Sequence, residues 1–341
     1  MNFDGLTVLI TGGTGSLGNA IVRRIMTGEM GKPRKLLVFS RDELKQYNMR
    51  HQWYQAKDAG EDIRNFATED LLEFHIGDIR LYDTLLPVLR RADVVINAAA
   101  LKQVPQCEFF PYEAVRTNIV GPYNIVRGIR EHGLPIQKVV TISTDKACKP
   151  VNVMGMTKAL QERLLLAGNA DVPDTDFMAV RYGNVIASRG SVIPHFKKQV
   201  EAGGPITITS PNMTRFLLTL DQAVDVVFEA LKSGQRGEIL VPQVPSARII
   251  DIASAMIGSR NIEIEEIGIR PGEKIDEILL SEEECFRTSE RNGYYVINTI
   301  LPIVKSNRDF EPVRTSEYTS GENLLSIEEL TELLVGAGYL D

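Results

Sequence analysis

The chain of 341 residues lacks the features of several common protein classes. Its three cysteines, Cys107, Cys148 and Cys285, lie far apart. They predict neither a disulfide framework nor a zinc site, and they are typical of a reducing compartment. The four histidines are also scattered, without the spacing of metal ligands. We therefore expect a protein that binds no metal.

Positive charge and long apolar runs are also scarce. The sequence has 38 basic and 45 acidic residues, a net charge of −7, which argues against a nucleic-acid partner. No apolar stretch reaches the roughly 18 residues that span a membrane. Strand-like sequence begins at Thr7, which leaves no room for a signal peptide. These features predict a soluble, cytoplasmic protein that does not insert into a membrane.

The first half of the chain alternates short apolar runs with amphipathic stretches, which predicts an α/β fold with a Rossmann-type doubly wound parallel sheet. We expect a Rossmann domain over residues 1–185, to which later segments return, and a smaller C-terminal α+β domain with a tail over 186–341. The predicted strands are Thr7–Thr11, Lys35–Phe39, Glu73–Ile76, Asp93–Ala98, Gln137–Ser143 and Phe177–Tyr182. Predicted helices include Ala20–Met30, Tyr82–Arg90, Ala114–His132 and Ser326–Val335, and Ile300–Gly321 is expected to be an extended tail.

A glycine-rich segment, Thr11–Gly18, lies between the first predicted strand and the first predicted helix. Gly12 permits a tight turn, Gly15 lets the backbone approach a pyrophosphate, and Gly18 lets helix and strand pack closely. In this position a dinucleotide site is favoured over a purely structural turn. The predicted cofactor contacts in the segment are Gly12, Thr14, Gly15, Ser16, Leu17 and Gly18.

The end of the second strand indicates which dinucleotide binds. NAD-binding proteins usually carry an acidic residue here, whereas this chain has Ser40 and Arg41, with Lys45 one turn later. A hydroxyl and a guanidinium suit a 2′-phosphate, so we expect NADP rather than NAD. In the alternative interpretation, Arg41 only pairs with Asp42 or Glu43 at the surface.

Further cofactor contacts are expected where the next strands end, because ligands bind there in open parallel sheets. Asp78 can accept a hydrogen bond from the adenine amino group. Asn118 either lies near the nicotinamide or makes a structural contact. The small side chains of one strand end let the backbone pass close to the cofactor; these are Ala98, Ala99 and Ala100. The other predicted contacts are Ile79, Lys102, Tyr182 and Asn184.

Thr144, Asp145 and Lys146 bring a hydroxyl, a carboxyl and an amine to the end of another buried strand. An acid and a base side by side suit proton transfer with a bound substrate. The alternative is a structural Asp–Lys ion pair. Lysine acts as a base only if its pKa is lowered, which burial or neighbouring cations cause. The nearby Cys148 is expected to be a packed thiol, because no histidine lies close to it in the sequence.

Together these residues resemble the extended short-chain dehydrogenase/reductase family, from Thr7 to about Tyr295. Within that family the chain is similar to the UDP-N-acetylglucosamine 4,6-dehydratases of bacterial surface-sugar pathways. The similarity rests on Phe39–Glu43, Ala98–Pro105, Ser143–Ala147, Arg181–Val185 and Arg270–Lys274. The resemblance implies NADP, a UDP-linked N-acetylhexosamine substrate bound mainly by the C-terminal domain, and a homo-oligomer.

In such a dehydratase the sugar C4 hydroxyl is oxidised, a base removes the C5 proton, and an acid protonates the departing C6 oxygen. The resemblance implies that Asp145 is this acid and Lys146 this base, that Thr144 hydrogen-bonds the C4 oxygen, and that Lys158 holds the nicotinamide ribose. Met154 stands where the family usually has the tyrosine that deprotonates the C4 hydroxyl. Asp145, or a water that it binds, would then take that proton.

For the diphosphate of the substrate we expect Asn184, Arg215 and Arg270, because arginine offers two parallel donors to phosphate oxygens. For each arginine, a surface salt bridge is the alternative. The resemblance also implies uracil contacts from Thr207 and Thr209 and a ribose contact from Glu273. The complete predicted substrate set is Lys102, Asn184, Val192, Thr207, Thr209, Arg215, Arg270 and Glu273.

Two other functions stay open. A nucleotide-sugar 4-epimerase needs only oxidation and reduction at C4, so the pair of Asp145 and Lys146 would be unexplained. A non-catalytic NADP-binding protein would explain a methionine at position 154. The sequence does not determine the configuration at C5 of a dehydrated product, any epimerisation at C3, or the size of an oligomer.

Overall fold

The computed structural model describes residues 1–58, 68–186, 192–301 and 311–340. Its main sheet contains β1 (Thr7–Thr11), β2 (Lys35–Ser40), β3 (Leu72–Ile76), β4 (Val94–Asn97), β5 (Lys138–Ile142), β6 (Asp176–Val180), β10 (Ile239–Pro242), β14 (Thr288–Arg291) and β15 (Tyr294–Ile297). In the described residues these nine strands lie in the order β14-β15-β10-β6-β5-β4-β1-β2-β3. Neighbours from β10 to β3 are parallel, and β15 pairs antiparallel with both β10 and β14. The predicted parallel α/β fold is confirmed.

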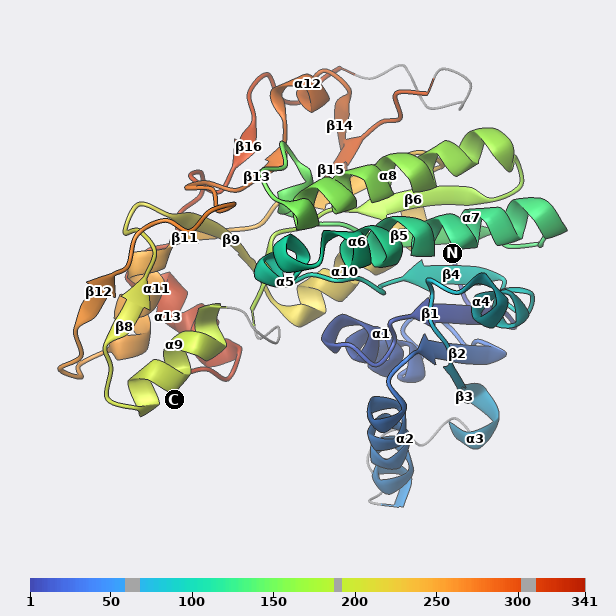
Figure 1. Ribbon diagram of the computed structural model, residues 1–341, viewed down its shortest axis with the longest axis horizontal. Helices are drawn as coiled ribbons and strands as arrows, with labels where there is room; N and C mark the ends of the chain where they lie inside the picture. Colours follow the sequence, from blue (N-terminus) through green and yellow to red (C-terminus); the bar gives the residue numbers. More distant parts are fainter. Residues whose placement is uncertain (59–67, 187–191, 302–310, 341) are drawn as a thin grey trace.

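Helices cover both faces of this sheet (Figure 1). One face packs against α1 (Ser16–Met26) and α10 (Leu220–Ser233), and the other against α4 (Tyr82–Leu89), α7 (Gly121–His132) and α8 (Val153–Asp171). Side chains alternate along β1: Val8 and Ile10 join the first apolar cluster, whereas Leu9 joins the second. Because both faces are covered, the middle residues of the central strands are apolar on both sides of the sheet, as is typical of parallel sheets.

A smaller unit lies at the left of Figure 1. Its apolar core is formed mainly by α9 (Val192–Glu201), β8 (Ile206–Ile208), α11 (Ile249–Ile257) and α13 (Ile327–Gly336). The remaining elements are α2 (Glu43–Asp58), α3 (Thr68–Leu71), α5 (Val104–Phe109), α6 (Pro111–Val115), β7 (Asn184–Val185), β9 (Thr214–Leu218), β11 (Ser246–Arg248), β12 (Ile264–Glu266), β13 (Ile278–Leu280), α12 (Glu282–Cys285) and β16 (Tyr318–Thr319). None of the helices in the described ranges is both long and apolar enough to cross a membrane.

Two predicted helices differ from the structure. The first helix begins at Ser16, directly after the glycine turn, and ends at Met26 rather than Met30, because Gly28 adopts a φ of 84°. The predicted helix Ala114–His132 is divided: a π-helical turn, Arg116–Val120 (η1), separates α6 from α7. Pro122 in the first turn of α7 has no N–H to donate, so the regular hydrogen-bond ladder is interrupted there.

The C-terminal part of the chain is more ordered than its sequence pattern indicates. In the predicted tail Ile300–Gly321, Tyr318 is buried, pairs through β16 with β13, and donates a hydrogen bond to the Val244 carbonyl at 2.9 Å. Residues 302–310 of this prediction lie outside the described residues. The last helix is confirmed with its predicted cap, since the Ser326 hydroxyl accepts from the N–H of Glu329.

Arg181, directly after β6, is fully buried and joins three parts of the chain. Its guanidinium binds Glu162 of α8 at 2.7 Å and Glu284 of α12 at 2.7 Å, and it donates to the Leu279 carbonyl of β13 at 2.9 Å. Every guanidinium nitrogen of Arg181 donates a hydrogen bond, as a buried cation needs. The two carboxylates carry one negative charge more than Arg181 offsets, and Arg287, 3.4 Å from Glu284, supplies a second positive charge. Burial by itself would raise the pKa of Glu284, but Arg181 lowers it to about 2.

We expect Glu284→Gln to lower the free energy of unfolding at pH 7 by about 3–5 kcal/mol, because Arg181 loses one of its buried counter-charges. A carboxyl with a lowered pKa stabilises the fold above its ordinary pKa of 4.5, and this contribution is lost as the pH falls toward about 2. The difference between the two proteins should therefore shrink below pH 4.5. Urea unfolding at pH 7 and pH 3 measures it, with the exposed Glu282→Gln as the control; equal stability at pH 7 would contradict the prediction.

Candidate functional site

The predicted acid–base residues lie in a tight turn at the carboxyl end of β5. Asp145–Ala147 form a short 3-10 helix (η2), capped by Thr144, whose hydroxyl accepts from the Lys146 N–H at 3.4 Å. The same hydroxyl donates to Asp145 Oδ1 at 2.8 Å. The Asp145 N–H donates to the carbonyl of Tyr182 at 3.1 Å, which ties the turn to the end of β6. The structure thus brings together Thr144, Asp145 and Lys146, as predicted from their adjacency.

The Lys146 ammonium lies between two carboxylates. Its Nζ is 3.0 Å from Asp145 Oδ1 and 3.3 Å from Glu277 Oε1, and it donates to Asn184 Oδ1 at 3.3 Å. Both carboxylates are buried, whereas the Lys146 side chain is 22% exposed. Asn184, predicted to contact the diphosphate, here holds the lysine. Glu277 was not predicted from the sequence as a site residue. The sequence offers one sign of it: Asp276 and Glu277 are adjacent carboxyls that closely follow the motif Arg270–Lys274.

These carboxylates determine the charge of Lys146. Burial alone would lower its pKa, but Asp145 and Glu277 outweigh burial and the opposing charge of Arg215, so that the net pKa is raised. The lysine is therefore protonated near neutral pH. This raised pKa differs from the lowered pKa expected of Lys146 as a base, because the two carboxylates favour the charged form of the amine.

Two buried carboxylate oxygens at this cluster have no hydrogen-bond partner among the described residues: Asp145 Oδ2 and Glu277 Oε2. Buried polar atoms are rarely left unpaired, because the lost hydration costs about 1–3 kcal/mol each. Both are acceptors only, so they suit a ligand hydroxyl or another proton donor.

Lys158 and Met154 follow on α8. Lys158 is buried, and its Nζ donates to the Ile142 carbonyl at 2.5 Å and to Gln161 Oε1 at 2.7 Å. Burial lowers the pKa of Lys158 to about 8. Met154 packs into an apolar cluster with Cys107 and Ala114. Its side chain therefore has a packing role in this structure.

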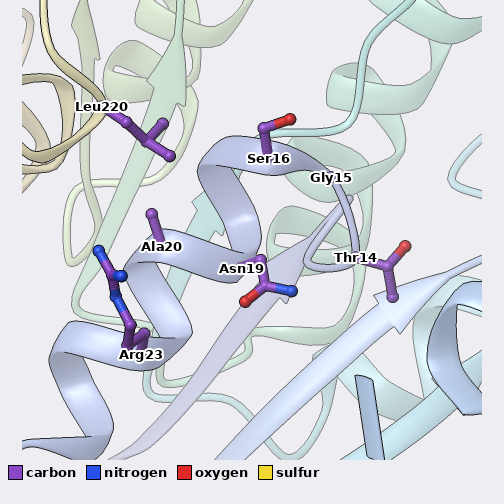
Figure 2. A pocket seen from close by; sticks show the side chains of 7 residues that line it. All are labelled: Thr14, Gly15, Ser16, Asn19, Ala20, Arg23 and Leu220. Atoms are coloured by element: carbon purple, nitrogen blue, oxygen red, sulfur yellow. The ribbon is translucent and has the colours of Figure 1, made fainter. Parts of the chain in front are cut away.

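The glycine turn has the close approaches that a dinucleotide site needs. A Cβ on Gly12, whose φ is 68°, would lie 2.7 Å from the Ala99 nitrogen, and one on Gly18 would lie 2.5 Å from Gly13 Cα. Gly15 precedes α1, and no side chain caps the first N–H groups of that helix. Figure 2 shows the pocket over this turn. Its lining consists of Thr14, Gly15, Ser16, Asn19, Ala20, Arg23 and Leu220; the predicted contact Leu17 is half-buried beside it.

The residues expected to choose between the cofactors lie at the end of β2. Ser40 is buried and accepts from Thr14 Oγ1 at 3.1 Å, so it joins β2 to the glycine turn. Lys45 pairs with Asp42 at 2.6 Å. Arg41 has a side chain that is 57% exposed, and its guanidinium is 4.0 Å from Asp78. Within the described contacts Arg41 therefore does not make the surface pair with Asp42 or Glu43 that was the alternative interpretation, and its ion-pair partner is Asp78.

Three other predicted cofactor contacts have structural partners. Asp78 accepts a bidentate hydrogen bond from Arg80, with a shortest distance of 2.6 Å. Ile79 packs in the core beneath α4 and α7. Asn118, in the π-helical turn, accepts from the N–H of Leu101 at 2.8 Å and donates to Thr157 Oγ1 at 3.0 Å. The loop after β4 carries four more of the predicted contacts. In it the side chains of Ala98 and Ala99 are half-buried, and those of Ala100 and Lys102 are exposed.

The predicted substrate residues are less closely grouped. Arg215 is buried and donates to the carbonyls of Thr214 and Ile275, and its Nε is 3.9 Å from Glu277. Arg270 is exposed, whereas Glu273 is half-buried and its Oε2 has no partner among the described residues. Thr207, Thr209 and Val192 belong to the smaller unit, where Thr207 Oγ1 accepts from Gln199 at 2.9 Å. Cys148 is buried, and burial raises the pKa of its thiol to about 12, which excludes a reactive nucleophile near neutral pH.

Comparisons with known proteins agree over most of the chain. The family model described as "Polysaccharide biosynthesis protein" matches residues 8–299. A UDP-glucose 4-epimerase of Rickettsia bellii (strain OSU 85-389) is 40% identical over 347 residues, covering 98% of this chain and 96% of that protein. The X-ray structure of Pen from Bacillus thuringiensis has a TM-score of 0.88 at 34% identity over 100% of both chains. DesIV from Streptomyces venezuelae, a dTDP-glucose 4,6-dehydratase solved with NAD, has a TM-score of 0.66 at 19% identity, covering 79% of this chain and 87% of its own, and shows a shared fold alone.

We expect Gly12→Ala to destabilise the protein by more than about 1 kcal/mol and to weaken binding of a dinucleotide, because the added Cβ meets the Ala99 backbone at a positive φ. Gly133→Ala is the matched control: its φ is also positive, at 55°, but nothing lies within 4 Å of the new Cβ. Thermal unfolding and calorimetric titration with NADP measure both effects. Equal losses in the two variants would show that the contact with Ala99 is unimportant.

Proposed function

The chain belongs to the polysaccharide biosynthesis protein family, and from this premise we propose that it is a nucleotide-sugar 4,6-dehydratase of the short-chain dehydrogenase/reductase type. Its proposed substrate is UDP-N-acetylglucosamine, and the product is a UDP-2-acetamido-2,6-dideoxy-4-hexulose, with or without inversion at C5. The observation that supports dehydration over epimerisation at C4 alone is the cluster that Asp145 and Lys146, after the end of β5, form with Glu277.

The glycine turn fits a nicotinamide dinucleotide, because Gly12 approaches the backbone of Ala98 and Ala99, directly after β4, too closely for a side chain, and α1 begins without a side-chain cap. In the proposal the phosphates lie at Gly12–Gly18, the adenosine lies near Ser40 and Arg41, and Lys158 holds the nicotinamide ribose. When bound, the cofactor supplies hydride acceptance from C4 and hydride return to C6.

Asp145 and Lys146 handle the protons of the dehydration. Thr144 orients the C4 hydroxyl, and the Asp145 carboxylate takes its proton, since Met154 has no group that can. The resulting carboxylic acid gives this proton to the C6 oxygen, which leaves as water, and the carboxylate is restored. Lys146, after losing its own proton to a neighbouring carboxylate, takes the proton of C5 and later returns it to C5.

The substrate groups bind around this cluster. In the proposal Arg215, Arg270 and Asn184 hold the diphosphate, Lys102 reaches the sugar or the diphosphate, Thr207 and Thr209 meet uracil, and Glu273 binds the uridine ribose. The buried Oε2 of Glu273 has no hydrogen-bond partner in the part of the chain that the structure describes. This supports the last assignment, because a ribose hydroxyl would supply the missing donor.

A second candidate is a UDP-sugar 4-epimerase, which the relatives of that name favour. It requires proton removal only at the C4 hydroxyl, and it gives no role to a base for C5. The two functions differ in the mass of the product, because only dehydration removes one water.

We expect the protein with NADP and UDP-N-acetylglucosamine in heavy water to form a product that has lost one water and carries deuterium at C5. Lys146→Ala should abolish this exchange and leave NADP affinity unchanged, because the variant loses the proposed base. The control is Lys149→Ala, three residues on, whose side chain pairs with Glu317 at the surface. Mass spectrometry and NMR of the product decide; an isomer of unchanged mass would identify an epimerase, and exchange retained in Lys146→Ala would refute the base.

We propose NADP rather than NAD as the cofactor, since Arg41 is exposed and not held by Asp42 or Glu43. Arg41→Ala should weaken NADP binding by about tenfold or more, the value of a charge-assisted hydrogen bond, and leave NAD binding nearly unchanged. Arg34→Ala, an exposed arginine at the opposite end of β2, is the control. Calorimetric titration with both cofactors measures the effect; tighter binding of NAD by the unmodified protein would overturn the assignment.

A further inference from the structure

Glu277 is a buried carboxylate at the beginning of a strand. It directly precedes β13, and its N–H donates to Ser320 Oγ at 2.8 Å. Farther along the same segment, Arg181 binds the Leu279 carbonyl, so the core fixes this backbone. Its Oε1 faces Lys146 Nζ at 3.3 Å, and its Oε2 is buried without a partner in the described residues.

The charged groups around Lys146 come from three separate elements. Asp145 belongs to the same turn as the lysine, Arg215 belongs to β9, and Glu277 precedes β13. Asn184 of β7 contributes a neutral acceptor. Glu277 is therefore the carboxylate that a distant segment adds to the turn, and the position of the lysine depends on the packing of that segment.

We propose that Glu277 is a positioning residue that acts through Lys146: its carboxylate holds the ammonium at the end of β5 and sets the pH at which this lysine loses its proton. One part of this inference rests on the proposed function, in which Lys146 exchanges a proton with C5 of the sugar. The effect on the charge of Lys146 is independent of the substrate.

A carboxylate at this position has two consequences. While it is ionised, it stabilises the ammonium form and so raises the pH at which Lys146 loses its proton. It is also a site to which that proton can move, and after accepting it Glu277 is neutral and no longer stabilises the ammonium. Gln at position 277 would have the same size and keep an acceptor oxygen, but it would supply neither the negative charge nor a site for that proton. A purely structural role for Glu277 would be preserved by such a substitution.

The test compares the full-length protein with Glu277→Gln, Glu277→Asp and the exposed control Glu282→Gln. Reductive methylation with formaldehyde at a series of pH values, followed by peptide mass spectrometry, reports the fraction of neutral Lys146. In Glu277→Gln the midpoint should move down by about one pH unit or more, so that labelling below the midpoint rises about tenfold. Glu277→Asp, which keeps the charge, should stay closer to the unmodified protein, and Glu282→Gln should match it.

A midpoint for Glu277→Gln that coincides with that of the unmodified protein would overturn the inference, as would equal shifts in Glu277→Gln and Glu277→Asp. Deuterium exchange at C5 of UDP-N-acetylglucosamine separates this result from the proposed function. A shift in labelling without exchange in any variant supports the role of Glu277 and contradicts the dehydratase. Exchange in the unmodified protein without a shift in labelling contradicts the role of Glu277 alone.

Discussion

The buried guanidinium of Arg181 is the interaction on which the site depends most. It lies after β6 and binds carboxylates of α8 and α12 together with a carbonyl of β13. A buried cation is tolerated only when its partners are present, so these four elements must assemble together. Two of them carry functional candidates: α8 carries Lys158, and the chain directly before β13 carries Glu277. Arg181 thus fixes two sides of the site without contacting Lys146.

The site itself concentrates charge in a small volume. An ammonium between two buried carboxylates, with an arginine behind one of them, is close to neutral as a group, yet two carboxylate oxygens keep free acceptor capacity. Such a group is costly to bury for stability alone. Perturbed, partly unsatisfied clusters at the carboxyl end of a parallel sheet are typical of active sites, because ligands bind at that edge.

The position of Met154 affects the choice of mechanism. A thioether in an apolar cluster takes no proton, so the proposed oxidation at C4 needs another acceptor. In the proposal this acceptor is Asp145, whose buried Oδ2 has no hydrogen-bond partner in the described part of the chain. In the proposed dehydratase, the proton that Asp145 takes from the C4 hydroxyl is later given to the departing C6 oxygen, so one residue serves both steps. An epimerase must return that proton to C4, which leaves Lys146 and Glu277 with no part in the reaction.

The sequence by itself determined the parallel sheet, the glycine turn, the capped last helix, and the adjacency of Thr144, Asp145 and Lys146. These features are local: side-chain period, turn residues and neighbours in the chain encode them directly. Only the tertiary structure decided that Glu277 joins Lys146, that Asn184 and Arg215 turn toward this cluster, and that the pKa of Lys146 is raised. The π-helical turn around Asn118 and the pairing of β16 were also decided there. Such contacts join segments far apart in the chain, and a charge is set by every group packed around it, which no local pattern records.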